Sequence, residues 1–184
     1  MGKAFLKWAG GKRWLVNSES HRFPTEYNRY IEPFLGGGAV FFFEEPNRAI
    51  LSDSYNELVI TYKAVRDNVD LVYKNLRIHS QKHSEEYYYQ IREKRPRKLY
   101  TIAARMIYLN KACFNGIYRV NREGKFNVPF GMRDSVSFDK GDLKGSSEAL
   151  QGVELLCQDF EATIDIAREN DFLFCDPPYA VVNE

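Results

Sequence analysis

The chain has 184 residues, of which 44% are apolar and 15% aromatic, and its 26 Lys and Arg nearly balance its 25 Asp and Glu. No apolar run is long enough to cross a bilayer, and this composition excludes a membrane protein, a disordered chain and a disulfide-rich miniprotein. Three widely spaced cysteines without a CxxC motif predict reduced thiols in a cytoplasmic protein.

The near-zero net charge hides a strongly uneven distribution. Residues 77–133 hold 13 Lys and Arg against four Asp and Glu, a net charge of +9, whereas residues 134–184 hold three against twelve, a net charge of −9. A basic block is often only a solvated face. Here, however, the basic residues alternate with aromatic residues, Asn, Gly and Pro, a pattern typical of surfaces that bind phosphates and stack on bases.

Four short apolar stretches predict buried strands over residues 30–34, 49–53, 153–157 and 172–176. Between the second and third, apolar and aromatic residues recur at three- and four-residue spacing. This spacing predicts helices over residues 56–63, 69–79, 84–94 and 99–112, with Pro96 separating the last two. Strands alternating with helices predict an α/β fold with a mainly parallel sheet, interrupted by a helical insertion. We expect the Gly- and Ser-containing stretch 140–147 to be the linker that returns the chain to the sheet.

A glycine turn follows the first predicted strand, in the sequence Phe34-Leu35-Gly36-Gly37-Gly38. Consecutive glycines let a backbone approach a ligand closely, although this turn matches neither the GxGxxG motif nor a P-loop. Seventeen residues after Gly36, Asp53 ends the second predicted strand, where a carboxylate can accept hydrogen bonds from both hydroxyls of a ribose. The alternative is that Asp53 caps the next helix, a role that Ser52 or Ser54 can also fill.

The fourth predicted strand ends in Asp176-Pro177-Pro178-Tyr179. Two prolines fix an extended backbone and remove two N–H donors, which leaves a turn rich in hydrogen-bond acceptors. Such a turn suits a ligand with an amino group, such as adenine: the Asp176 carboxylate and the Pro177 carbonyl accept the N6 hydrogens, and Tyr179 stacks on the base. The alternative is a rigid turn that ends a strand.

These motifs, in this order, resemble the Dam-type DNA adenine-N6 methyltransferases. The other matching segments are FLKWAGGK at 5–12, EPFLGGG at 32–38, YLN at 108–110 followed by NG at 115–116, and GKFNVPFG at 124–131. The resemblance runs from residue 3 to about Ala180. It implies a Rossmann-like methyltransferase sheet, incomplete at its C-terminal side, with an inserted α-helical DNA-recognition subdomain. We expect a discontinuous catalytic domain of residues 1–55 and 135–184 and a target-recognition insertion of residues 56–134.

The resemblance also implies roles for individual residues. It assigns S-adenosylmethionine binding to Trp8, Lys12, Phe34, Gly36, Gly38, Asp53 and Asp176, with Trp8 beside the sulfonium. It assigns catalysis to Asp176, Pro177, Pro178 and Tyr179. It assigns DNA contacts to Lys7, Phe114, Asn115, Ile117, Arg119 and Pro129, among which Arg119 is the best reader of a guanine. From the residues alone, Trp8 is a core anchor, Lys12 is a surface charge at a helix start, and Phe114 and Ile117 pack beneath a loop.

The reaction that the resemblance implies is methyl transfer from S-adenosylmethionine to adenine N6 in double-stranded DNA, with GATC as the suggested target, in restriction-modification or DNA replication. We expect direct transfer without a covalent enzyme intermediate. We also expect no metal, because His21, His79 and His83 are scattered and the pair His79 and His83 lacks a third ligand.

Five residues follow Tyr179, whereas members of the family that the chain resembles continue for a substantial further segment. This predicts an unpaired edge on the fourth strand and little activity for the chain by itself, unless a second chain supplies the missing strands. Two other interpretations stay open. One is a truncated, catalytically inactive DNA-binding remnant. The other is a nicotinamide-dependent oxidoreductase, which leaves the DPPY motif and the basic block unexplained.

Overall fold

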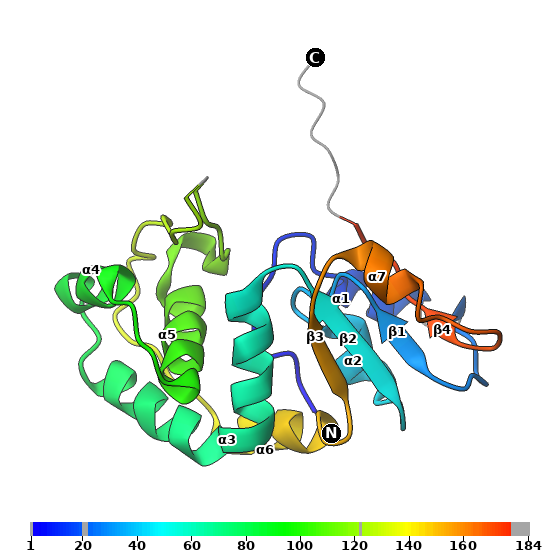
Figure 1. Ribbon diagram of the computed structural model, residues 1–184. Coiled ribbons are helices and arrows are strands. Elements are labelled where there is room, and N and C mark those ends of the chain that lie inside the picture. Colours follow the sequence, from blue (N-terminus) through cyan, green and yellow to red (C-terminus); the bar gives the residue numbers. More distant parts are fainter. Residues whose placement is uncertain (1, 20–21, 122, 178–184) are drawn as a thin grey trace.

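The computed structural model describes residues 2–19, 22–121 and 123–177. Within these ranges, four parallel strands form one sheet in the order β3-β2-β1-β4 (Figure 1). The strands are β1 (Tyr30–Glu32), β2 (Ala49–Asp53), β3 (Glu154–Cys157) and β4 (Phe172–Leu173). β1 is buried throughout and β2 over its first four residues, as expected for strands covered on both faces. The predicted α/β class with a parallel sheet is confirmed.

Three strands are shorter than the sequence predicts: β3 begins at Glu154 instead of residue 153, and β1 and β4 end early. β1 ends at Glu32 instead of residue 34, and Pro33, which lacks an N–H donor, follows it directly. β4 pairs with β1, and the last backbone bond between the two segments in the described residues runs from the Phe174 amide to the Ile31 carbonyl. In the described part of the sheet, β4 has a partner strand on one side only and is therefore an edge strand. The chain leaves the sheet after residue 174, before it reaches Asp176.

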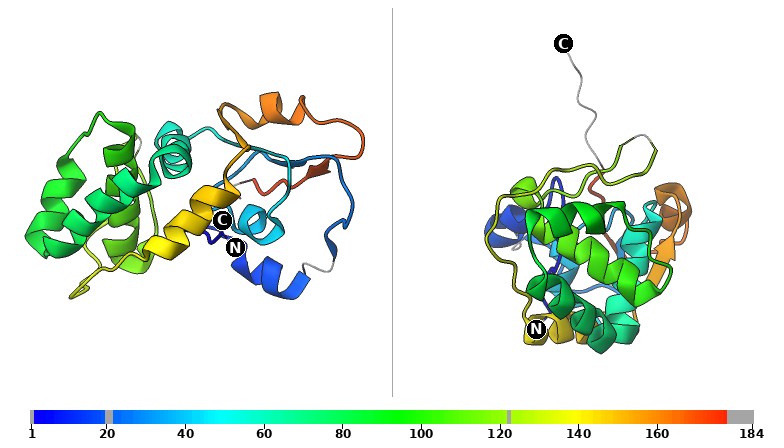
Figure 2. Two further views of the ribbon diagram at one scale, coloured as in Figure 1. Left: turned by 90° about the horizontal axis from the view of Figure 1, so that it is seen from below. Right: turned by 90° about the vertical axis from the view of Figure 1, so that its left-hand side faces the viewer.

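Short helices cover both faces of the sheet. The helices α1 (Arg13–Glu19) and α2 (Ala39–Glu44) lie on one face, and α7 (Phe160–Ile164) lies on the other (Figure 2). The hydroxyl of Ser52 in β2 bonds to the hydroxyl of Thr163 in α7 at 2.7 Å, so the buried polar groups between these layers satisfy each other.

The helical part begins with a long helix, α3 (Asn56–Gln81), which is followed by α4 (Glu85–Glu93), α5 (Leu99–Ala112) and the 3₁₀ turn η2 (Phe114–Gly116). α3 joins the two helices predicted over 56–63 and 69–79, and only Asn68 has non-helical dihedral angles, which mark a kink. The predicted helices 84–94 and 99–112 correspond to α4 and α5. No helix in the described ranges is both long and apolar enough to cross a membrane.

The prediction that residues 140–147 form a linker is wrong, because they belong to the helix α6 (Lys140–Ala149). The side chain of Asp139 accepts a hydrogen bond from the Asp142 amide and caps the helix start. The small buried residues Ser146 and Ser147 let α6 pack closely: their hydroxyls bond to the carbonyls of Lys3 and Arg66. Tertiary packing thus outweighs the low helix propensity of glycine and serine.

One core of buried apolar residues runs through the sheet and the helices. Four of its fully buried side chains are tyrosines, and each hydroxyl has a hydrogen-bond partner. These are Tyr30 with Glu32, Tyr62 with the Gly36 carbonyl, Tyr88 with the Val128 carbonyl, and Tyr108 with His83.

The N-terminal segment, residues 2–8, connects the sheet part to the helical part. Asn110 in α5 is buried, and its side chain accepts from the Lys7 amide at 2.9 Å and donates to the Lys7 carbonyl at 2.7 Å. The same amide group also donates to the Gly116 carbonyl at 3.2 Å. One side chain therefore fixes both the N-terminal segment and the turn after α5.

We predict that Asn110→Ala lowers the free energy of unfolding by about 2–4 kcal/mol, because it leaves three backbone groups without their partner in a buried place. Asn75→Ala is the matched control. Asn75 donates only within its own helix, to the Leu71 carbonyl, and its loss is expected to cost no more than about 0.5 kcal/mol. Urea unfolding measures both, and equal losses would contradict the role given to Asn110.

Candidate functional site

Three carboxylates gather at the carboxyl edge of the parallel sheet. Glu32 ends β1, Asp53 ends β2, and Asp176 follows β4. Parallel strands point their carboxyl ends to the same edge, which is where open α/β sheets bind ligands. The three are close enough for the charges of Asp176 and Asp53 to raise the pKa of Glu32. This edge is therefore rich in carboxyl groups.

The glycine turn is held against this edge by its backbone. The Gly36 amide donates to Asp53 Oδ2 at 3.1 Å, and its carbonyl accepts from the Tyr62 hydroxyl at 3.1 Å. Gly36 and Gly38 have φ values of 48° and 64°, in the left-handed region that favours glycine. A Cβ on Gly36 would lie 2.8 Å from Trp8 Cδ1, so the backbone lies directly on the indole. The turn thus has the positive φ values expected of its glycines, and its backbone lies close to Trp8; its approach to a ligand stays a prediction.

Asp53 is not the cap of the following helix. Its Oδ1 accepts from the Tyr55 amide at 2.9 Å, but Tyr55 itself is the capping residue of α3 and makes no side-chain cap bond. The Ser52 hydroxyl bonds to Pro33 and Thr163 and does not cap either. Burial raises the pKa of the Asp53 carboxyl, and the bonds from the Tyr55 and Gly36 amides oppose that rise.

A group of packed aromatic side chains lies beside the glycine turn. Trp8 stacks on Tyr118 with ring centroids 5.7 Å apart and an interplanar angle of 10°, and Tyr55 lies 6.4 Å from Trp8. Trp8 is partly exposed and packs against the core. Phe34, another predicted cofactor residue, stacks on Phe160 at 5.2 Å.

Lys12 reaches the predicted catalytic turn. Its ammonium forms an ion pair with Asp176 Oδ2 at 2.7 Å, and the two side chains are only 12% and 19% exposed. Lys12 also donates to the Gly10 carbonyl at 2.8 Å. Lys12 does directly precede α1, as the alternative interpretation holds, but it is not a simple surface charge.

Of the predicted catalytic residues, Pro177 is exposed, and Pro178 and Tyr179 lie outside the described residues.

Sequence reasoning missed Glu32 as a site residue. The side chain is 3% exposed, accepts a hydrogen bond from the Tyr30 hydroxyl at 2.8 Å, and has its pKa raised to about 8, mainly by burial. The signal for Glu32 that the sequence did contain is a carboxylate at the end of a strand predicted to be buried.

The residues predicted to contact DNA are exposed, as their role requires. Phe114 and Ile117 are 54% and 43% exposed, so they do not pack beneath a loop. The Phe114 amide bonds to the Pro129 carbonyl at 2.9 Å, and Lys7 lies against Gly116. Arg119, which directly precedes the isolated bridge between Val120 and Phe126, is exposed. The structure thus brings most of this set to one end of the helical part. The full set is Lys7, Phe114, Asn115, Ile117, Arg119 and Pro129.

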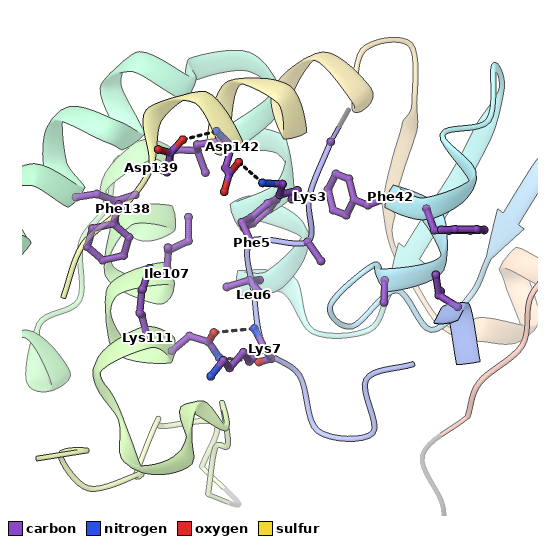
Figure 3. Close-up of a pocket in the computed structure, with 18 of the residues that line it drawn as sticks. Lys3, Phe5, Leu6, Lys7, Phe42, Ile107, Lys111, Phe138, Asp139 and Asp142 are labelled. Carbon is purple, nitrogen blue, oxygen red and sulfur yellow. Dashed lines mark hydrogen bonds and ion pairs between the residues drawn. The ribbon is translucent and has the colours of Figure 1, made fainter. Parts of the chain in front are cut away.

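A cavity of about 610 Å³ lies beside the N-terminal segment (Figure 3). The segment 2–7, α2, α5 and the start of α6 line it, with the Lys3–Asp142 ion pair on its wall. Its lining includes Lys7 but not Trp8, the glycine turn, Asp53 or Asp176. The cavity is therefore separate from the cluster at the sheet edge.

Within residues 2–19, 22–121 and 123–177, no three His, Cys, Asp or Glu side chains are grouped as a metal ion requires. His79 and His83 have structural partners, since their Nδ1 atoms lie 2.8 Å and 3.0 Å from the hydroxyls of Tyr87 and Tyr108. Burial, followed by the charge of Lys94, lowers the pKa of His79 to about 4. The third histidine, His21, lies outside the described ranges.

Comparison with known proteins gives a consistent result. The D12 class N6 adenine-specific DNA methyltransferase family matches residues 8–184. The chain is 36% identical over 191 residues to the type II methyltransferase M1.LlaDCHI of Lactococcus lactis, covering 99% of this chain and 67% of the relative. It is 36% identical over 204 residues to M.MjaIII of Methanocaldococcus jannaschii, covering 99% and 71%. It is 33% identical over 182 residues to the DNA adenine methylase of Escherichia coli K12, covering 97% and 65%. The chain thus spans roughly two thirds of the length of these relatives.

The contact between Gly36 and Trp8 gives a testable prediction. Gly36→Ala should lower the free energy of unfolding by about 2–5 kcal/mol, because an alanine meets both left-handed strain and the indole. Gly152→Ala is the matched control: Gly152 has a φ of 74° and open space where the methyl group would lie, so it incurs only the strain, about 1–2 kcal/mol. Denaturant unfolding followed by tryptophan fluorescence measures both. Equal losses would show that the indole does not press on the turn.

Proposed function

The chain belongs to the D12 class N6 adenine-specific DNA methyltransferase family, and on this premise we propose that it transfers a methyl group from S-adenosylmethionine to adenine N6 in double-stranded DNA. One observation carries the proposal. Trp8, the Gly36–Gly38 turn, Asp53 and the Lys12–Asp176 pair meet at the carboxyl edge of one parallel sheet.

The residues at this edge fit S-adenosylmethionine chemically. An ionised carboxylate has about four acceptor positions, and two backbone amides use two of those on Asp53, so two remain for the hydroxyls of a ribose. The partly exposed ring of Trp8 offers a π face to a cationic sulfur. When bound, this cofactor supplies an electrophilic methyl group.

Charge also favours a cationic ligand. Glu32, Asp53 and Asp176 share the edge with the ammonium of Lys12, which is paired with Asp176. A sulfonium ligand brings positive charge to a place where carboxylates outnumber the nearby cation. The family match does not support the oxidoreductase interpretation.

The pairing of Asp176 with Lys12 suggests how the turn positions a base. Lys12 holds Oδ2 of the carboxylate, so the orientation of Asp176 is fixed while Oδ1 is left to accept an N6 hydrogen. The Pro177 carbonyl accepts the other hydrogen, and the nitrogen lone pair then points at the methyl carbon. Positioning and fixed electrostatics supply most of the rate in such a direct transfer, and Pro178 and Tyr179 complete the turn by holding and stacking on the base.

We assign DNA binding to the insertion of residues 56–134 and cofactor binding to residues 1–55 and 135–184. The net charge of +9 on residues 77–133 and the exposed Phe114, Ile117 and Arg119 support this division. Arg119 is proposed to bind guanine O6 and N7, and GATC is the proposed target.

Removing the Asp53 carboxylate tests cofactor binding. We expect Asp53→Ala to weaken S-adenosylmethionine binding at least about a hundredfold, because each hydrogen bond to a charged acceptor contributes about 1.5–3 kcal/mol. Calorimetric titration measures the affinity, with circular dichroism to verify the fold. Asp165→Ala, which removes an exposed carboxylate beside α7, is the control and should bind normally. Unchanged affinity in Asp53→Ala would remove Asp53 from the cofactor site.

DNA binding is expected to weaken steeply with salt, with log affinity falling linearly as log salt rises, because phosphate contacts release counterions. Arg119→Ala should reduce discrimination at one base pair by about 1–3 kcal/mol. Lys125→Ala on the same hairpin is the control: Lys125 pairs with Glu123 and should leave discrimination unchanged. Fluorescence anisotropy with variant duplexes measures both. A flat salt response would show that the basic block is only a solvated surface.

A further inference from the structure

Glu57 joins two aromatic residues beside the site to a buried arginine, and the proposed methyl transfer gives it no role. It lies in the first turn of α3, and its side chain is 27% exposed. Its Oε1 atom pairs with Nη1 of Arg105 at 2.9 Å, and its Oε2 atom accepts hydrogen bonds from the hydroxyls of Tyr55 at 3.0 Å and Tyr118 at 3.4 Å. One carboxylate therefore binds a cation through one oxygen and two tyrosines through the other.

The guanidinium of Arg105 fixes the position of this carboxylate. Arg105 lies in α5 and is 4% exposed, and a buried charge is tolerated only when it is paired and hydrogen-bonded. Its Nε and Nη2 atoms donate to the carbonyls of Ile91 at 3.0 Å and Arg92 at 2.7 Å, in the last turn of α4, where a helix favours cations. The start of α3, the end of α4 and the middle of α5 thus meet at Arg105, which gives Glu57 a rigid support.

The two tyrosines that bind Glu57 are also the ones whose rings pack on Trp8. Tyr118 stacks on the indole with centroids 5.7 Å apart, and Tyr55 lies 6.4 Å from it. Burial, followed by the charge of Glu57, raises the pKa of the Tyr118 hydroxyl to about 12, so this group keeps its proton at neutral pH and donates to the carboxylate. Because hydrogen bonds to a charged acceptor are the stronger ones, Glu57 has the means to set how both rings lie against Trp8.

Tyr118 also leads directly to the proposed base reader, Arg119, which is the next residue. The side chain of Tyr118 is 6% exposed and packs on the ring of Phe126 with centroids 4.6 Å apart. Arg119 itself is exposed. The segment that carries Arg119 is thus attached to the core through Tyr118, whose hydroxyl bonds to Glu57.

We propose that Glu57 is a positioning residue for both ligands of the proposed enzyme. Through the hydroxyls of Tyr55 and Tyr118, it holds Trp8 in place beside the cofactor. Through Tyr118, it also holds Arg119 in place at the DNA. This inference rests on the proposed function, because it requires S-adenosylmethionine beside Trp8 and a duplex at Arg119. In this role Glu57 touches neither ligand, and its whole effect passes through two hydroxyl groups.

A double-mutant cycle on cofactor affinity tests this route. Tyr118→Phe removes one hydroxyl and keeps the ring, and we expect it to weaken S-adenosylmethionine binding about fivefold, within the range of coupling between groups in contact. In a Glu57→Gln background, the same change should alter the affinity less than about twofold, because the carboxylate through which the hydroxyl acts is already gone. Calorimetric titration measures the affinities. Equal effects of Tyr118→Phe in both backgrounds would overturn the proposal.

Tyr27→Phe is the matched control. The Tyr27 hydroxyl also donates to a glutamate, Glu44, at 3.3 Å, and its side chain is partly buried. It precedes β1, however, and so lies toward the opposite edge of the sheet from the site. Its removal should leave the cofactor affinity unchanged. A loss equal to that in Tyr118→Phe would show that the effect is not specific to the hydroxyls at Glu57.

DNA discrimination is the second readout, because partial unfolding does not change it. Discrimination is the ratio of the affinities for the best-bound duplex and for a duplex altered at one base pair, and a smaller folded fraction lowers both equally. Fluorescence anisotropy should show this ratio lowered about fivefold in Glu57→Gln and in Tyr118→Phe, and unchanged in Tyr27→Phe. An unchanged ratio in the first two variants would contradict the proposal.

A further variant keeps the test decisive, since Glu57→Gln leaves a buried guanidinium without its charged partner and can fail to fold. In that case the double variant Tyr55→Phe/Tyr118→Phe replaces it and leaves the ion pair with Arg105 intact. It should weaken cofactor binding more than Tyr118→Phe alone, and circular dichroism verifies its fold. Unchanged affinity in this double variant would overturn the role of Glu57 and leave the proposed function standing. Absence of any binding of S-adenosylmethionine to the wild type would instead contradict the proposed function.

Discussion

The position of Gly36 is the constraint on which the rest of the site depends. Its amide is held by Asp53 at the end of β2, its carbonyl by Tyr62 from α3, and its Cα lies against the indole of Trp8. One residue in the left-handed region therefore joins the N-terminal segment, the end of β2 and the helix α3. Glycine is needed there because any Cβ would meet both strain and the ring. The geometry of the sheet edge follows from this arrangement.

The same N-terminal segment links the two halves of the molecule. Lys7 and Trp8 are adjacent: the Lys7 backbone is bound by Asn110 of α5, and Trp8 contacts Gly36 and stacks on Tyr118. In the proposed function, the residue beside the cofactor is thus one peptide bond away from a residue at the DNA. A rigid connection of this kind is what positioning catalysis requires, because reacting atoms must be held within a fraction of an ångström.

The sequence predicted those features that local patterns determine. The strand 49–53 and the helix 99–112 were predicted with the bounds that the structure gives, because apolar periodicity and burial agree there. Helix α6 was missed, since Gly141, Gly145 and two serines are typical of a linker, and only its packing on Lys3 and Arg66 explains the helix. The approach of Lys12 to Asp176 and the burial of Glu32 among acidic groups depend on segments far apart in the chain. No local pattern contains that information, whereas the motif order was enough to identify the family.

We propose that S-adenosylmethionine binds beside Trp8 and the glycine turn, at the carboxyl edge of the sheet. The chain has two tryptophans, and Trp14 is 61% exposed on α1, so each indole N–H reports on a different place. A Cβ on Gly36 would lie 3.3 Å from Trp8 Nε1, which puts this nitrogen at the turn. Titration of ¹⁵N-labelled protein with S-adenosylmethionine, with the signals assigned through Trp14→Phe, measures this directly. We expect the Trp8 indole signal to shift saturably while that of Trp14 stays in place. A saturable shift of Trp14 with an unmoved Trp8 would show that the cofactor binds elsewhere.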